Sequence, residues 1–385
     1  MAVNARLGGA VKRREDPRLI TGAGRYTDDM RPDGSLHAVF VRSPHARARI
    51  TGVEVSDAKA MPGVVGVFQA ADLSFASETA RPRLCSDEVK FVGDAIAVAV
   101  ASTRDEAVDA AAAVVVDYEV LPAVVDVTAA MQPDAIRVHQ DMDDNSAFDF
   151  DLGEEGALEG ADVVVRGRFV NQRLAAVPIE ANAVVAEPDG KGGIRMWAST
   201  QVPFGVRGQV ADALGLEEAE VHVIAADVGG AFGAKLMTYP EQSVIALLAR
   251  NLERPVCWFE YRSENMVAMT HGRGQVQEVA LGATSDGKLV GLEVDMISDA
   301  GAYAGLAPPQ IILTALLAAG VYALPRIRYK ARCVYTNTTV MSAYRGAGRP
   351  EAIALIERAM DMLAVELRLD PAELRRRNMI SGPFP

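Results

Sequence analysis

Apolar residues along the first third of the chain either alternate with polar ones or run without interruption. Residues 36–41 alternate as a half-buried strand does, whereas residues 95–101 are almost wholly apolar and predict a strand buried on both faces. Residues 64–68 and 114–118 predict two further strands. Thr103, with Glu106 three residues later, predicts a capping box for a helix that runs through residue 113. This pattern predicts one compact α/β domain over residues 15–125.

The next segment, residues 126–156, is rich in acidic side chains. Its aspartates are Asp141, Asp143, Asp144, Asp149 and Asp151. Aspartates at alternate positions can indicate a calcium loop, but the central glycine and the terminal glutamate of an EF-hand are missing. We therefore expect an acidic, solvated linker here.

From residue 157 to residue 385 the pattern predicts a second domain. Strands are expected at 163–170, 183–186, 194–198, 221–225, 256–260, 274–282 and 289–298, and helices at 203–214, 241–250 and 349–369. Asp286-Gly287 predicts the hairpin turn between the last two strands.

Composition and charge exclude several classes of protein. Half of the 385 residues are hydrophobic and the formal net charge is −12, which argues against nucleic acid as the main partner. No apolar run reaches the roughly 18 residues that a membrane helix needs. Residues 1–14 lack the apolar segment of a secretory signal peptide, so we expect a cytoplasmic protein, with co-export alongside a partner left open.

The three cysteines, Cys85, Cys257 and Cys333, lie far apart in the sequence and form no C-x-x-C pair. Neither an iron–sulfur cluster nor a structural zinc site can be built from them alone, so we expect buried, reduced thiols.

Three loops carry candidate chemistry. Residues 227–235 form a glycine loop between a predicted strand and helix, and its free N–H groups would suit an anionic or oxo group. The spacing fits neither a dinucleotide-binding motif nor a P-loop, so an ordinary glycine-rich turn is the alternative. Gln201 follows a strand, where α/β proteins place ligands, although a lone glutamine there is more often a surface residue. Arg345 stands in a third loop between residues 343 and 352, where it could bind an oxo anion or pair with a carboxylate or helix carbonyls.

These loops, together with three further segments, resemble the xanthine dehydrogenase, aldehyde oxidase and carbon monoxide dehydrogenase family of molybdenum hydroxylases. The further segments are GAVKRREDPRLITG at 9–22, VRSPHA at 41–46 and ELRRRN at 373–378. The resemblance runs in order along the whole chain. It implies an α+β fold, with an α/β-hammerhead domain followed by the first molybdopterin-binding domain of the aldehyde oxidase type.

The resemblance also implies a cofactor and the residues that contact it. The cofactor is a pterin whose dithiolene sulfurs hold the molybdenum, so no protein side chain need bind the metal, and the cytosine dinucleotide form is expected. A [2Fe-2S] cluster and FAD would lie on partner subunits. By resemblance, the cofactor contacts are Gln201, Gly229, Gly230, Ala231, Phe232, Gly233, Arg345, Gly346 and Ala347.

The catalytic glutamate of the family belongs to the second cofactor domain, which would begin about where this chain stops. We therefore expect no catalytic residue in this chain, and a second molybdenum-domain subunit as a partner; a piece of a full-length subunit is the alternative. Glu180 matches a family glutamate of structural function. The resemblance then implies hydroxylation of an electron-poor carbon with water as the oxygen source.

Departures from the family pattern narrow the expected substrate. Leu236 and Leu313 stand where the xanthine enzymes have Glu and Arg, and Ala347 stands where they have an aromatic residue. Gly346 replaces the cysteine that holds copper in carbon monoxide dehydrogenase. A pocket formed by Leu236, Leu313 and Ala347 favours aldehydes or aromatic N-heterocycles over xanthine. The alternative function is a non-catalytic binding or maturation module that retains the fold.

Overall fold

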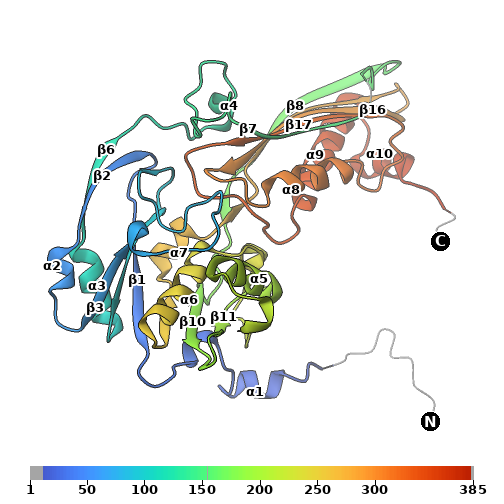
Figure 1. The fold of residues 1–385 in the computed structure, drawn as a ribbon. Coiled ribbons are helices and arrows are strands. Elements are labelled where there is room, and N and C mark those ends of the chain that lie inside the picture. The colour runs from blue at the N-terminus through green and yellow to red at the C-terminus, as the bar shows by residue number, and fades with distance from the viewer. Residues whose placement is uncertain (1–11, 154, 383–385) are drawn as a thin grey trace, which may run out of the picture.

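The computed structural model describes residues 12–153 and 155–382 (Figure 1). The start of the opening motif, residues 9–11, and the end of the chain at residues 383–385 lie outside the described residues. The fold is α+β, as expected, and the described residues form a seven-stranded, a five-stranded, a three-stranded and a two-stranded sheet.

The first large sheet has seven strands and takes them from both halves of the chain. Their order is β12 (Val221–Ile224), β11 (Ile194–Ala198), β10 (Ala183–Pro188), β13 (Val256–Phe259), β1 (Leu36–Arg42), β5 (Ala95–Ala101) and β3 (Val64–Gln69). β1 pairs in parallel with β13, with Leu36 opposite Val256. One sheet therefore joins the two predicted domains, although their boundaries in sequence remain a prediction.

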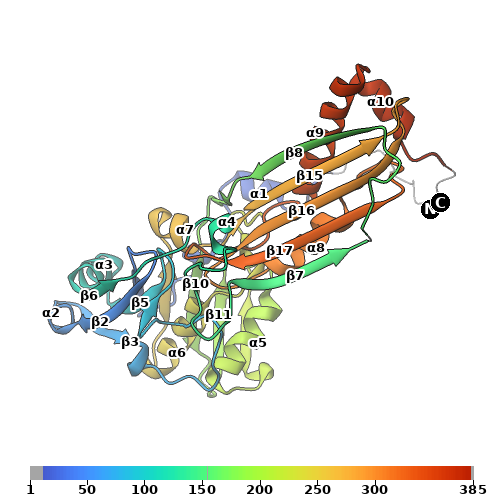
Figure 2. The same cartoon turned by 90° about the horizontal axis from the view of Figure 1, so that it is seen from above.

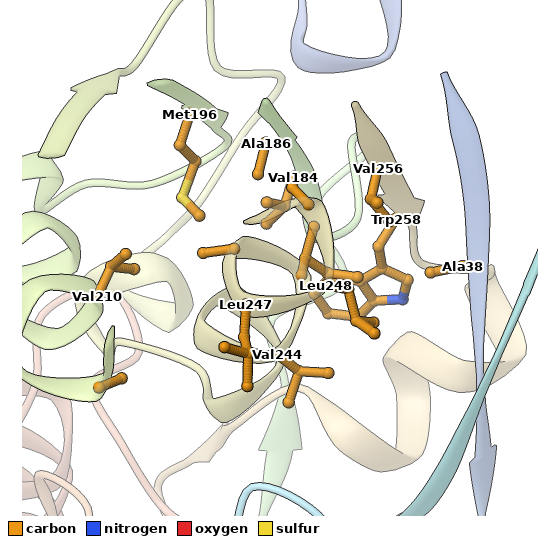
Figure 3. Close-up of a cluster of buried hydrophobic side chains, with 14 of the residues drawn as sticks. Ala38, Val184, Ala186, Met196, Val210, Val244, Leu247, Leu248, Val256 and Trp258 are labelled. Carbon is orange, nitrogen blue, oxygen red and sulfur yellow. The ribbon is translucent and has the colours of Figure 1, made fainter. Parts of the chain in front are cut away.

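The core of this sheet explains why α6 (Pro240–Leu252) and α5 (Pro203–Leu214) form where they do. Val244, Leu247 and Leu248 of α6 are buried against Trp258 and Val184 of the strands (Figure 3). The helix α5 ends at Gly215, whose left-handed conformation closes it at the predicted residue.

The N-terminal part adds a small sheet with the order β4 (Glu88–Val89), β2 (Ala48–Glu54) and β6 (Val115–Val120). The helix α3 (Arg104–Ala113) packs on β1 and β5. The predicted capping box is confirmed: the Thr103 hydroxyl accepts from the Glu106 N–H, and the Glu106 carboxylate accepts from the Thr103 N–H. The short elements are α1 (Asp16–Ile20), η1 (Thr27–Asp29), α2 (Ser56–Lys59), η2 (Ala70–Asp72) and α4 (Val127–Ala130).

The second large sheet has five strands, and its two long helices lie on one of its faces. Its order is β7 (Ser146–Leu152), β17 (Ile327–Tyr335), β16 (Leu289–Gly301), β15 (Gln275–Ala283) and β8 (Val163–Asn171). α8 (Ala307–Leu316) and α9 (Arg349–Leu367) pack under it (Figure 1), whereas the short helix α4 lies on the opposite face, at the ends of β16 and β17 (Figure 2). The remaining elements are β9 (Leu174–Ala175), η3 (Glu218–Glu220), η4 (Ala234–Leu236), α7 (Arg262–Ala268), β14 (His271–Gly272) and α10 (Pro371–Asn378).

The expectation of a solvated acidic linker is wrong for residues 146–152, which form the edge strand β7. Phe148 and Phe150 pack against the core of the five-stranded sheet, while Asp149 and Asp151, which alternate with them, are exposed. The alternate aspartates therefore follow the two-residue period of a strand with one wet face, and not the spacing of a calcium loop.

The cysteines match their prediction, because Cys85, Cys257 and Cys333 are buried and unpaired. Within the part of the chain that the structure describes, no helix is both long and apolar enough to cross a membrane. Among the same residues, His, Cys, Asp and Glu side chains form no group of three or more that could hold a metal ion.

Candidate functional site

Two of the three candidate loops meet because of the strand order. β11 and β12 are parallel neighbours, so their carboxyl ends lie at the same edge of the sheet. Residues 199–201 leave β11 at this edge, and the glycine loop leaves β12 beside them. Crevices at the carboxyl ends of parallel strands are where α/β folds bind ligands.

Gln201 and the glycine loop are joined by two hydrogen bonds. The Gly233 N–H donates to Gln201 Oε1 at 3.0 Å, and the Gln201 N–H donates to the Lys235 carbonyl at 3.0 Å. The first bond fixes which way the amide points, because only its oxygen can accept. The Gln201 amide nitrogen has no hydrogen-bond partner among the described residues, so it is left to donate to a ligand.

Beneath the glycine loop, Lys235 and Glu180 form a buried polar cluster. The Lys235 ammonium, 1% exposed, donates to Ser199 Oγ at 2.6 Å and to the Glu180 carbonyl at 2.9 Å, and lies 3.4 Å from Glu180 Oε2. That carboxylate oxygen also accepts from the Gly229 N–H at 2.6 Å. Burial lowers the pKa of Lys235, and Glu180 opposes the shift. The cluster ties both ends of the loop to the strand end at Ser199.

The third loop reaches the glycine loop through backbone contact. A Cβ placed on Gly233 would lie 2.8 Å from the Ala343 carbonyl oxygen, and the residue has φ +98°, so only glycine fits both conditions. Arg273 holds the third loop from below: its guanidinium donates to the Arg345 carbonyl at 2.8 Å and pairs with buried Glu351 at 3.1 Å. The same side chain stacks on the ring of Tyr344 at 4.8 Å.

Both loops also hold non-glycine residues in conformations that side chains rarely adopt. Phe232 has φ +54° and Ala347 has φ +25°. Such strain persists only where the surroundings enforce it, and it gathers at ligand sites. Phe232 is 42% exposed, so its ring is not held there by burial.

The opening segment covers the start of the glycine loop. The Arg18 guanidinium donates to the Asp227 carboxylate, at 2.6 Å for Nη2 to Oδ1, and the Arg25 N–H donates to the same group at 2.9 Å. Arg18 thereby lowers the pKa of Asp227 to about 2. This contact gives the opening motif a physical role, because its arginine anchors the loop that it precedes by about 200 residues.

The electrostatics of the site favour an anion. α5 starts directly after Gln201, and α9 starts directly after the third loop, with Gly348 as its N-cap. The N-termini of two helices therefore lie next to the loops, and each carries partial positive charge. Arg345 is exposed, and its side chain makes no hydrogen bond or ion pair with the described residues. The arrangement can accept an anionic, oxygen-rich group.

Comparison with known proteins decides the family. Residues 138–379 match the model of the molybdopterin cofactor-binding domain, and residues 21–122 match the α/β-hammerhead domain of aldehyde oxidase and xanthine dehydrogenase. The chain belongs to the aldehyde oxidase and xanthine dehydrogenase family. The expected order of hammerhead and first cofactor-binding domain is confirmed.

Individual relatives of the family agree with this assignment. The chain is 34% identical, over 97% of its length, to the nicotine 6-hydroxylase large subunit of Paenarthrobacter nicotinovorans, and 32% identical, over 92%, to the nicotinate dehydrogenase large molybdopterin subunit of Eubacterium barkeri. These matches cover 48% and 85% of the two relatives. Quinoline 2-oxidoreductase from Pseudomonas putida 86 superposes with a TM-score of 0.91 at 37% identity, covering 97% of this chain and 50% of that one. The chain thus spans about half the length of most relatives that it matches.

The structure brings most of the predicted contact residues together but leaves the predicted substrate pocket incomplete. Gln201, Gly233 and the third loop adjoin one another. Leu313 of α8 packs against the third loop, because its Cβ lies 2.8 Å from the position that a Cβ added to Gly348 would take. Leu236 is 38% exposed. A substrate pocket shared by Leu236 and Leu313 stays a prediction.

Sequence reasoning missed the residues that hold the loops from below. Lys235 was noted only as part of the glycine motif, and Arg273 was not singled out. The available signal for Lys235 is a lone lysine directly after the uncharged stretch at residues 228–234. Arg273 has no comparable signal, because its partners Tyr344, Arg345 and Glu351 lie more than 70 residues away.

Proposed function

We propose that this chain is the molybdenum-cofactor-binding part of a multi-subunit hydroxylase that oxidises an aldehyde or an aromatic N-heterocycle with water as the oxygen source. The observation that carries the proposal is the meeting of Gln201, the glycine loop and the third loop at the carboxyl ends of parallel strands. Since the chain spans about half of most relatives, the complete activity and the other subunits are part of the proposal.

The donors at this site suit an oxo-rich molybdenum cofactor. The Gln201 amide nitrogen and the Arg345 guanidinium are both without partners among the described residues, and they flank a loop of backbone N–H groups. When bound, the cofactor would supply the oxygen atom transferred to substrate and take up two electrons. Gln201 and Arg345 would hold its oxygen atoms, and residues 229–233, 346 and 347 would line it. Donors fixed in advance in this way stabilise developing negative charge.

The expected substrate follows from uncharged side chains beside the loops. Leu236, Leu313 and Ala347 offer no polar anchor for a purine dione, and Gly346 offers no sulfur ligand for copper. A flat heterocycle or an aldehyde needs neither. The names of the nicotine, nicotinate and quinoline relatives support an N-heterocycle as the first class to test.

The remaining parts of the enzyme would come from other polypeptide. We propose a second molybdenum-domain subunit that carries the catalytic glutamate and most contacts to a cytosine dinucleotide form of the pterin. A [2Fe-2S] subunit and an FAD subunit would carry electrons away. Several relatives are named as large or gamma subunits, which supports a complex of this kind, and we expect it in the cytoplasm.

Molybdenum analysis and turnover of the purified complex test the proposal. We expect the wild-type complex to contain molybdenum and to reduce a dye with quinoline or benzaldehyde. Gln201→Ala and Arg345→Ala should lower molybdenum content, or turnover by about tenfold or more, because each removes a donor aimed at the cofactor.

Gln132→Ala and Arg195→Ala are matched controls on exposed side chains away from the loops, and both should leave the two readouts unchanged. Wild-type values for both site variants would remove these residues from the site. A complex that holds molybdenum yet reduces no dye with any aldehyde or heterocycle would instead support a binding or maturation module.

A further inference from the structure

A cavity of about 530 Å³ lies beside the glycine loop and is not explained by the cofactor site. It forms where residues 79–83, the segment after the glycine loop at 237–240 and residues 303–305 meet. Met142, Met237, Pro240 and Val340 give it apolar walls. This volume falls within the range of small-molecule pockets, which are mostly apolar and carry a few polar groups that set specificity.

Arg83 lines the cavity and is a buried cation without a counter-charge. Its side chain is 8% exposed and donates to the Ser77 carbonyl at 2.6 Å and to Ser77 Oγ at 3.2 Å. Its Nε has no hydrogen-bond partner and no carboxylate pairs with it among the described residues, although its guanidinium stacks on the Phe75 ring at 4.3 Å. Burial accordingly lowers the pKa of Arg83. An unpaired buried charge is costly, so a ligand that brings a negative charge would relieve the cost.

Two further groups in the wall point to the same chemistry. The Tyr303 hydroxyl is buried without a hydrogen-bond partner among the described residues, in a side chain 6% exposed. Arg81 approaches Glu241 only to 4.0 Å, and that carboxylate already accepts from Arg42 at 2.9 Å. Among the described residues that line the cavity, Asp141 carries the carboxylate, and it is exposed. The cavity wall thus offers two guanidinium groups and a hydroxyl against apolar surface.

We propose that this cavity binds a small organic acid. Its carboxylate lies at Arg83 and the Tyr303 hydroxyl, and its apolar body lies against Met142 and Met237. The methionine-lined walls favour an organic acid over inorganic phosphate, because phosphate would leave them in contact with a strongly hydrated ion. The residues named for this site belong to this chain and are not among the proposed cofactor contacts, so benzoate binding is measurable without the cofactor.

Calorimetry with benzoate on the 385-residue chain tests the proposal. We expect Arg83→Met to weaken benzoate binding by about tenfold or more, the usual scale for a lost charge-assisted hydrogen bond. Tyr303→Phe should weaken it less, because it removes a neutral donor. Arg83→Lys keeps the charge and should retain most of the affinity, and Arg195→Met, on an exposed arginine elsewhere, should bind as wild type does.

Two further ligands test the charged and the apolar part of the site separately: benzamide, which carries no charge, and inorganic phosphate, which has no apolar body. Benzamide has the shape of benzoate without its charge and should bind about tenfold more weakly or worse; equal affinity would overturn the role of Arg83. Inorganic phosphate should bind more weakly than benzoate, and the reverse order would overturn the apolar part of the site. No benzoate binding by wild type up to about 10 mM would refute the proposal outright. If Arg83→Met fails to fold by circular dichroism, the Arg83→Lys variant and the benzamide comparison decide the question.

Discussion

The cluster beneath the glycine loop predicts a large stability loss for Lys235→Met. The substitution removes hydrogen bonds of 2.6 and 2.9 Å and leaves Glu180 facing no cation. Breaking a buried pair by removing one partner costs about 3–5 kcal/mol. The Glu180 side chain is 14% exposed and keeps the Gly229 N–H, so we expect a loss of about 3 kcal/mol, at the lower end of that range.

Urea unfolding followed by tryptophan fluorescence measures this loss. Both tryptophans, Trp197 and Trp258, stand in the seven-stranded sheet, so the signal reports on the part of the molecule that carries the loop. The matched control is Arg195→Met, which breaks the exposed pair with Glu187 and should cost less than about 1 kcal/mol.

The reasoning would fail if Lys235→Met lost no more stability than this control. A double-mutant cycle with Glu180→Gln gives a second check. Because Lys235 and Glu180 are in contact, their coupling energy should exceed about 1 kcal/mol. Additive losses would show that Lys235 acts through packing alone.

Three further predictions concern pH and the two loops. Burial and the nearby Arg173 lower the pKa of His271 from 6.5 to about 4. The folded state therefore favours the neutral ring, so the stability that His271 contributes is complete above pH 6.5 and falls by up to about 3 kcal/mol toward pH 4. His271→Gln should flatten the pH dependence of the urea midpoint over this range. Arg273→Met should release the third loop and speed its cleavage by trypsin at least severalfold, and an unchanged rate would contradict its role. Gly233→Ala should cost about 1–3 kcal/mol more than Gly34→Ala, which has a similar positive φ but open space around it; equal losses in thermal unfolding would count against the close approach of the loops.

Local patterns predicted the elements well where the signal lies within a few residues. The apolar run at Ala95–Ala101 is buried on both faces, and the Thr103 capping box starts α3 where expected. The hairpin turn at Asp286-Gly287 and the end of α5 at Gly215 were also visible, because one residue type fixes the backbone at each place.

The strand β7 shows where local reading failed. Phe148, Asp149, Phe150 and Asp151 alternate as a strand does, but the surrounding aspartates drew attention to charge. The pairing that makes this segment a strand comes from β17, nearly 180 residues away, and β17 itself was not predicted. An edge strand can be rich in aspartate when the aspartates occupy every second position and face the solvent.

The sequence allowed the loops of the site to be predicted, but not the residues that hold these loops in place. Gln201, the glycine loop and Arg345 stand out because glycines and strand ends mark them. Their mutual contacts depend on the parallel pairing of β11 with β12, and neither Glu180 with Lys235 nor Arg273 with Glu351 shares a local pattern. Side chains that pair across long stretches of sequence produce no periodic pattern from which the pairing could be predicted.

The parallel pairing of β1 with β13 also sets an order of events during synthesis. β1 leaves the ribosome early, but its neighbour at Val256–Phe259 is made more than 200 residues later. Until then β1 presents an unpaired edge beside β5, and such edges are prone to pair with other chains. The nascent hammerhead segment is therefore the stretch that most needs protection by chaperones. If only this segment were exchanged between relatives, the new β1 would still have to pair with the β13 of the old chain.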